Sequence, residues 1–141
     1  MQFNLEELNQ EAIYERAKAE SLLIQSGTVA SHRNRSLNEL ISTCTYGQAA
    51  EQFLIQYCGF TDDPRRYKDV FNTSGESIEV KVTTKVSNVH YVLKRLNEYK
   101  PDKWRMISDI VYVFINDRKN TTYTLEGIYR WNGQHFAKEY Y

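Results

Sequence analysis

The sequence predicts a mixed α/β fold in which helices pack on a central sheet. Two observations support this prediction. Residues 36–58 repeat apolar side chains at helical spacing, whereas residues 77–83 alternate apolar with charged side chains and residues 107–115 are almost continuously apolar. With 141 residues, the chain is long enough for one domain with a substantial core.

The N-terminal segment predicts a first helix. Asn4 followed by Glu7 forms a capping box, and Ser26-Gly27 is a plausible end. Residues 28–35 are polar and predict a loop. The segment has neither a basic start nor an apolar stretch of signal-peptide type, so we expect a cytoplasmic protein without a membrane partner.

A second capping box, Ser36 with Glu39, predicts a helix that ends at Gly59. Gly47 is a candidate break or kink in it. Cys44 and Cys58 lie about four turns apart on this helix, too far for a disulfide, which predicts two free thiols.

The character of the chain then changes to strands. Tyr67–Phe71 and Ser77–Thr83 are separated by a strong turn signal, residues 72–75, and predict a hairpin. In the second strand one face is apolar and the other carries charge.

The remaining elements complete a sheet. Ser87 is a candidate cap for a helix to about Tyr99, and residues 107–115 predict a central strand covered on both faces. Residues 122–131 predict a further strand, and the turn at 132–133 leads to a short last one. We expect the tyrosines and Trp131 near the C-terminus to pack a sheet face or an interface; stacking on unpaired bases is their alternative role.

Charge does not exclude nucleic acid as a partner. The chain has 18 basic and 18 acidic residues, but residues 81–105 hold seven basic residues against two acidic ones. The chain contains neither a Cys-x-x-Cys or His-Glu-x-x-His metal pattern nor a glycine-rich phosphate loop.

The informative motif is Asp69, followed after nine residues by Glu79-Val80-Lys81. Glu79 and Lys81 are two apart on one strand and therefore share a face. A hairpin crossing brings Asp69 beside them. Because two close carboxylates repel, a hard divalent cation is the natural third component, and Mg²⁺ binds through one or two carboxylates plus waters and phosphate oxygens.

These residues resemble the PD-(D/E)xK nuclease superfamily, including restriction-type nucleases and archaeal Holliday-junction resolvases. Lys68 stands where the family has proline. Glu51, within Gly47-Gln48-Ala49-Ala50-Glu51, matches a glutamate on the family's first core helix, and Gly59-Phe60 matches the pair after it. The resemblance spans about residues 46–116.

The resemblance implies a restriction-endonuclease-like αβββαβ core, with a mixed central sheet flanked by helices. We expect one nuclease domain over 1–141, with a helical extension at 1–35 and the core and C-terminal strands in 36–141.

The implied activity is an Mg²⁺-dependent DNA endonuclease, with Mn²⁺ as a substitute. Asp69, Glu79 and Glu51 would serve the metal, and Lys81 would position or activate the water. One alternative is a Holliday-junction resolvase. Another is a non-catalytic DNA-binding or interaction module with the same fold.

Basic residues around the motif are the candidate DNA contacts. They are Arg65, Arg66, Lys68, Lys85, Lys94 and Arg95. We also expect a homodimer, formed through the N-terminal helix, because cutting both strands symmetrically needs two sites.

Overall fold

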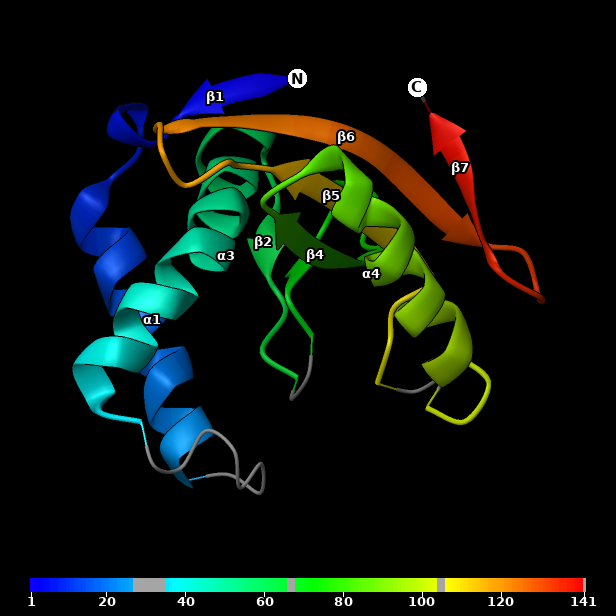
Figure 1. Cartoon of the computed structure of the whole chain (residues 1–141), viewed down its shortest axis with the longest axis horizontal. Helices are drawn as coiled ribbons and strands as arrows, with labels where there is room; N and C mark the ends of the chain where they lie inside the picture. Colours follow the sequence, from blue (N-terminus) through cyan, green and yellow to red (C-terminus); the bar gives the residue numbers. More distant parts are fainter. Residues whose placement is uncertain (27–34, 66–67, 104–105, 141) are drawn as a thin grey trace.

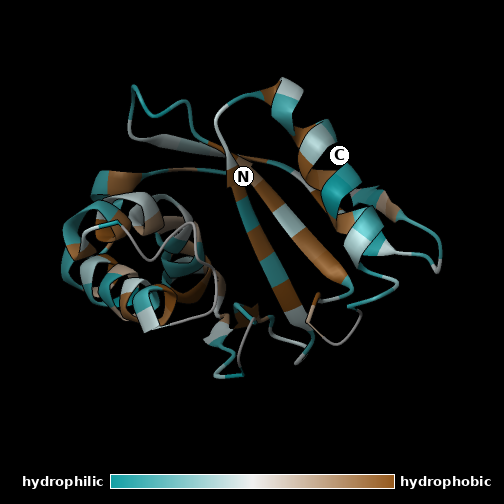
Figure 2. Ribbon diagram, turned by 60° about the horizontal axis from the view of Figure 1, so that its bottom comes forward, coloured by the Kyte–Doolittle hydropathy of each residue, from teal (hydrophilic) through white to brown (hydrophobic). Residues whose placement is uncertain are grey.

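The computed structural model describes the whole chain except residues 27–34, 66–67, 104–105 and 141. The described part is a mixed α/β structure with three α-helices and a curled, seven-stranded sheet. Helices α1 and α3 lie together on one side of the central strands and α4 lies on the other (Figures 1 and 2). The predicted fold class is confirmed at this level.

The N-terminus differs from the prediction. The chain begins with strand β1 (Gln2–Asn4) and a short 3-10 helix, η1 (Leu5–Glu7), before helix α1 (Gln10–Ser26). Asn4 does act as a cap, but of η1, where its Oδ1 accepts a hydrogen bond from the Glu6 N–H. Phe3 explains the strand: its ring stacks between those of Phe53 and Tyr123, and this anchors β1 in the core.

Helix α1 packs on helix α3 (Leu37–Cys58), and its buried face holds Ile13, Ala17 and Ser21. These residues are occupied within the chain and are not available to a second copy. Ile13 belongs to the same core cluster as β1 and α3, so the extension at 1–35 shares its core with the rest of the chain.

Helix α3 follows the sequence prediction closely. Ser36 caps it by accepting a hydrogen bond from the Glu39 N–H over 3.2 Å, and Gly59 ends it in the left-handed conformation with φ 73°. The helix continues through Gly47, so the predicted break there is wrong. No neighbouring atom lies within 4 Å of where a Cβ would be, so packing does not require a glycine at this position. Both cysteines on it are free thiols, as predicted.

The sheet order is β1-β6-β5-β4-β3-β2, with β7 paired to β6. Strands β4 (Ser77–Thr83) and β5 (Ile110–Ile115) are parallel neighbours, and helix α4 (Val86–Tyr99) connects them. Strand β6 (Thr122–Trp131) runs antiparallel to β5, and both β1 and β7 (Phe136–Tyr140) pair with β6.

Two cores cover the two faces of this sheet. Ile78 and Val80 of β4 pack with α3, while Val111 and Val113 of β5 pack with α4. Helix α4 starts two residues earlier than predicted, with Lys85 rather than Ser87 at the cap position. No helix in the described ranges is both long and apolar enough to cross a membrane.

The hairpin before β4 is shorter than predicted. Strand β2 (Thr61–Asp62) pairs with β3, which covers only Val70–Phe71. Asp69 therefore precedes the strand on which the sequence placed it, and Tyr67 lies outside the described residues. Strand β5 likewise starts at Ile110 rather than at residue 107, because the Ile107 carbonyl accepts a hydrogen bond from the Lys100 ammonium.

Candidate active site

The site forms where strand β4 loses its neighbour. Among the described residues, β3 pairs with β4 only at Ser77 and Ile78. Two residues further along, the Val80 N–H donates to Asp69 Oδ2 over 2.7 Å. Asp69 thus occupies the hydrogen-bonding position that another strand residue would fill, which fixes its carboxylate at the edge of β4.

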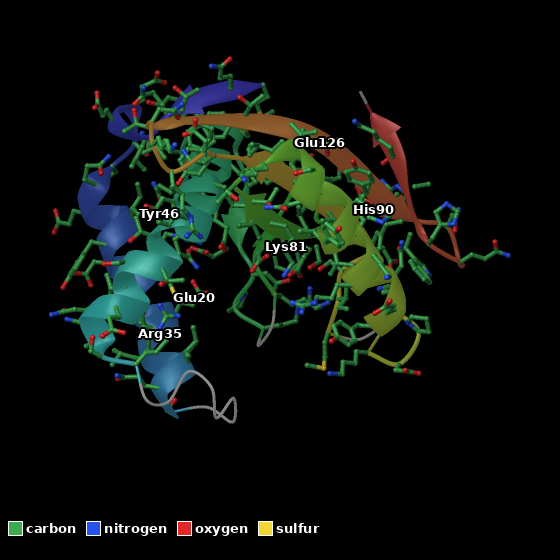
Figure 3. All side chains as sticks on the ribbon, viewed as in Figure 1. Glu20, Arg35, Tyr46, Lys81, His90 and Glu126 are labelled. Carbon is green, nitrogen blue, oxygen red and sulfur yellow. The ribbon has the colours of Figure 1, made fainter. Side chains whose placement is uncertain are left out.

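Glu79 and Lys81 flank Val80 and share the opposite face from the apolar one. Their side chains form an ion pair, with 3.3 Å between Glu79 Oε1 and Lys81 Nζ. The Glu79 side chain is largely buried, whereas that of Lys81 reaches solvent. Lys81 lies between the α1–α3 pair and α4 (Figure 3). The side chains of the predicted Glu-x-Lys pair therefore lie together in the region between these helices.

Glu79 also carries an unusual atom. Its Oε2 is buried and has no hydrogen-bond partner among the described residues. Because a buried carboxylate oxygen without a partner costs free energy, such atoms call for an explanation, and a bound ion is one.

Glu51 reaches the same region from helix α3. It is only 6% exposed, and its Oε1 pairs with Arg16 Nη2 over 3.1 Å. Burial raises the pKa of Glu51 well above its usual value; the negative charge of Asp69 adds to this rise, and Arg16 opposes it. The three predicted carboxylates, Glu51, Asp69 and Glu79, are thus electrostatically coupled.

The other two carboxylates respond in the same way. Burial, reinforced by the charge of Glu79, raises the pKa of Asp69 to about 8. Burial also raises the pKa of Glu79, which the Lys81 ammonium counteracts. Near neutral pH, without a cation, the cluster keeps at least one proton because three negative charges cannot be held so close in a dry environment.

The cluster includes residues that sequence reasoning missed. Arg16 of α1 pairs with Glu51, and most of its side chain is shielded from solvent. It also contacts Asp62 Oδ1 over 2.7 Å and Gln48 Oε1 over 2.9 Å. Glu20, one turn later on α1, accepts a hydrogen bond from Gln48 Nε2 over 2.8 Å. Both follow the buried stripe of α1 at i+3 spacing, a signal that could have placed them beside α3.

The donor set suits a hard cation bound through few protein ligands. No group of three or more His, Cys, Asp or Glu side chains in a metal-holding arrangement occurs in the described part of the chain. Mg²⁺ commonly uses one or two carboxylates and completes its shell with water and substrate oxygens. Asp69 and Glu79, with the unpartnered Oε2, fit that pattern.

Two predicted DNA contacts lie next to the cluster. Arg65 is held by the buried Asp63, with 2.6 Å between Arg65 Nη2 and Asp63 Oδ2. Burial lowers the pKa of Lys68, and the charge of Glu79 opposes this. Lys68 and the buried Lys100 both stabilise the charged form of Glu79.

The other predicted DNA contacts lie on the surface of the α4 region. Lys85, Lys94 and Arg95 are exposed, the first at the start of the helix and the other two on its outer side. Arg66 lies outside the described residues. Lys94 lines a groove between α4 and β7, together with His90 and Phe136, so it does not border the carboxylate cluster.

Comparison with known proteins leaves the site to be judged on its own geometry. No family model matches the chain, and no curated protein matches its sequence at a significant level.

Proposed function

We propose that this protein is an Mg²⁺-dependent DNA endonuclease with a PD-(D/E)xK-type site, in which Mn²⁺ can replace Mg²⁺. The observation that carries the proposal is the partly buried pair of Asp69 and Glu79, with one buried and unpartnered carboxylate oxygen, at the open edge of β4. Burying two carboxylates is costly unless a cation compensates them, and phosphodiester hydrolysis is chemistry that such a cation supports.

The element order supports the finer fold proposal. From α3 onward the chain runs α3, β2, β3, β4, α4, β5, which is the αβββαβ order of a restriction-endonuclease-like core. The parallel pairing of β4 with β5 is the pairing that a crossover helix such as α4 allows.

Each site residue has a proposed role. Asp69 and Glu79 hold the cation, which when bound polarises the phosphodiester and acidifies a water. Lys81, paired with Glu79 but open to solvent, orients the attacking water or stabilises charge on the phosphate. Glu51, fixed by Arg16, adds negative charge behind Asp69 and supports the site.

The test is incubation with Mg²⁺ or Mn²⁺ and a panel of linear duplex, single-stranded, supercoiled and four-way-junction DNA. We expect cleavage by the wild type and none by Asp69→Ala, Glu79→Ala or Lys81→Ala. Glu76→Ala is the matched control, since Glu76 is an exposed glutamate of the same hairpin whose partners are Asn72 and Arg130. Full activity in all three site variants would contradict the proposal.

The panel also separates the alternatives. Preference for the four-way junction would assign a resolvase. No cleavage of any DNA, together with no binding of Mg²⁺ or Mn²⁺, would assign a non-catalytic module.

We also propose a homodimer when both strands are cut. Helix α1 still exposes Tyr14, Leu22 and Leu23 after packing on α3, and these side chains are available to a second copy. The mass in sedimentation equilibrium, with Leu23→Asp as the variant, tests this: two chains are expected for the wild type and one for the variant. A wild-type mass of one chain would contradict it.

A further inference from the structure

The aromatic residues near the C-terminus are occupied in the core. Tyr129 and Phe136 are buried, and the Trp131 ring packs against Phe136 with 5.2 Å between centroids. This confirms the expected packing role for Tyr129 and Trp131; Tyr141 lies outside the described residues. Among the residues of described exposure after Gly75, the exposed tyrosines are Tyr91 and Tyr99 of α4.

Tyr91 and Tyr99 of α4 are 67% and 46% exposed, with the exposed Arg95 midway between them. The three residues are spaced four apart, so they follow one another along a single side of the helix. We refer to Tyr91, Arg95 and Tyr99 as the α4 stripe. Both rings are exposed on a helix whose apolar face is already buried, which leaves part of their surface available to a ligand.

The stripe runs from the outward side of α4, at Tyr91, to the flank on the side of β4, at Arg95 and Tyr99. The inward side of the helix is marked by Val89 and Leu96. His90 and Asn97 mark the flank toward β7, where the Asn97 side chain accepts a hydrogen bond from the Phe136 N–H. At 100° per residue Arg95 and Tyr99 fall on the opposite flank. Tyr91 faces outward between the two flanks, with its ring edge-on to that of His90 at 5.5 Å between centroids. In Figure 3, His90 lies on the β7 side of α4 and Lys81 beyond its other side.

The surroundings of the stripe are basic. The ammonium of Lys103 lies 5.2 Å from the centre of the Tyr99 ring, a cation–π contact. Lys85 lies exposed at the start of the helix, whereas Lys94 and Glu98 line the groove on the β7 flank. An alternation of aromatic rings and cations is the surface that a single nucleic acid strand requires, since bases stack on rings while phosphates pair with cations.

We propose that the α4 stripe binds an unpaired stretch of the substrate DNA, with bases stacked on Tyr91 and Tyr99 and the intervening phosphate at Arg95. This proposal rests on the proposed nuclease function. It names the substrate class as DNA with single-stranded character next to the scissile bond. Duplex DNA hides its base faces and cannot use the two rings.

The test is fluorescence anisotropy of the full-length protein in EDTA with two labelled probes, oligo-dT of about 15 nucleotides and a duplex of the same length. We expect Tyr91→Ala and Tyr99→Ala each to weaken binding of oligo-dT by about 5- to 100-fold, as loss of one stacked base predicts. Tyr91→Phe and Tyr99→Phe keep the ring and should bind as the wild type does. Duplex affinity should change less than twofold in all four variants.

Tyr57→Ala is the matched control, because Tyr57 is a comparably exposed tyrosine, at 55%, on α3. It should leave binding of oligo-dT unchanged. Three results would overturn the proposal: wild-type affinity in both alanine variants, an equal loss for the single strand and the duplex, or no binding of oligo-dT by the wild type. The last result would point to a protein partner for the exposed rings.

Failure of this inference and failure of the proposed function are distinguishable. Binding in EDTA needs neither metal nor cleavage, so a stripe that binds oligo-dT in a protein that never cuts DNA would contradict only the nuclease. A protein that cuts DNA with unchanged activity on single strands in Tyr91→Ala and Tyr99→Ala would contradict only the stripe.

Discussion

Helices α3 and α4 cover opposite faces of the same sheet but bury different kinds of residue. The buried positions of α4 are apolar, Val89 and Leu96, with its charges directed outward. Helix α3 also buries apolar residues, but between them it buries Gln48, Glu51 and Gln52. Helix α4 therefore serves the core alone, whereas helix α3 places polar groups in a buried region where they cost free energy.

This difference indicates which side of the sheet carries the functional residues. A buried carboxylate is tolerated when partners compensate it, and Arg16 compensates Glu51 only in part, because burial and Asp69 still keep its pKa raised. Residues that break the rules of stable packing tend to cluster at functional sites. The α3 side should therefore respond to charge and cations, and the α4 core should not.

The largest expected effect is on the α4 side. Leu96→Ala removes a buried leucine and should lower the free energy of unfolding by about 3 kcal/mol, equally with and without Mg²⁺. Glu51→Gln on the α3 side should change stability by less than about 1 kcal/mol, because the amide oxygen can still accept from Arg16 and Arg16 keeps its ion pair with Asp62. Urea denaturation measures both. A destabilisation of several kcal/mol by Glu51→Gln would contradict the contrast.

Next in size is the ion pair between α1 and α3. Arg16→Met should cost about 2 kcal/mol, less than the usual 3–5 for breaking a buried pair because Glu51 can take up a proton. Arg35→Met is the control: its ion pair with Glu39, at 3.9 Å, is exposed and should contribute under about 0.5 kcal/mol. Thermal unfolding of both variants checks the order, and equal losses would show that burial of Glu51 is unimportant.

The pH dependence sharpens the comparison further. The folded protein holds a proton on Asp69, with a pKa of about 8, that the unfolded chain releases near pH 4. Raising the pH therefore favours unfolding, by up to about 1.4 kcal/mol per unit between these values for this one group. Asp69→Asn should flatten the decline in stability between pH 5 and pH 8. A wild-type profile as flat as that of the variant would contradict the raised pKa.

Local patterns predicted α3, α4, β4 and β6 because each has a clear apolar period and definite ends, such as Ser36 and Gly59. Strand alternation also predicted that Glu79 and Lys81 share one face, whereas Glu51 was singled out by the family resemblance and not by a local pattern. Strand β1 was missed because it depends on Phe3 stacking with rings about 50 and 120 residues away. Asp69 was placed on a strand, since nothing local shows that its side chain, not its backbone, bonds to Val80.

Arg16 and Glu20 were not predicted for a similar reason. Their roles depend on the packing of α1 against α3, which brings together residues more than 25 positions apart. The resemblance to a nuclease core began after them and gave no reason to look there.

The central claim is that Asp69 and Glu79 stay buried because a divalent cation compensates their charge. Isothermal titration of the protein with MnCl₂ at pH 6, 7 and 8 tests it most directly. We predict one site per chain, proton release on binding, and an affinity that rises by up to about tenfold per pH unit because the cation displaces the proton on Asp69. Glu79→Gln should abolish this site. Binding that is absent, independent of pH, or unchanged in Glu79→Gln would contradict the claim.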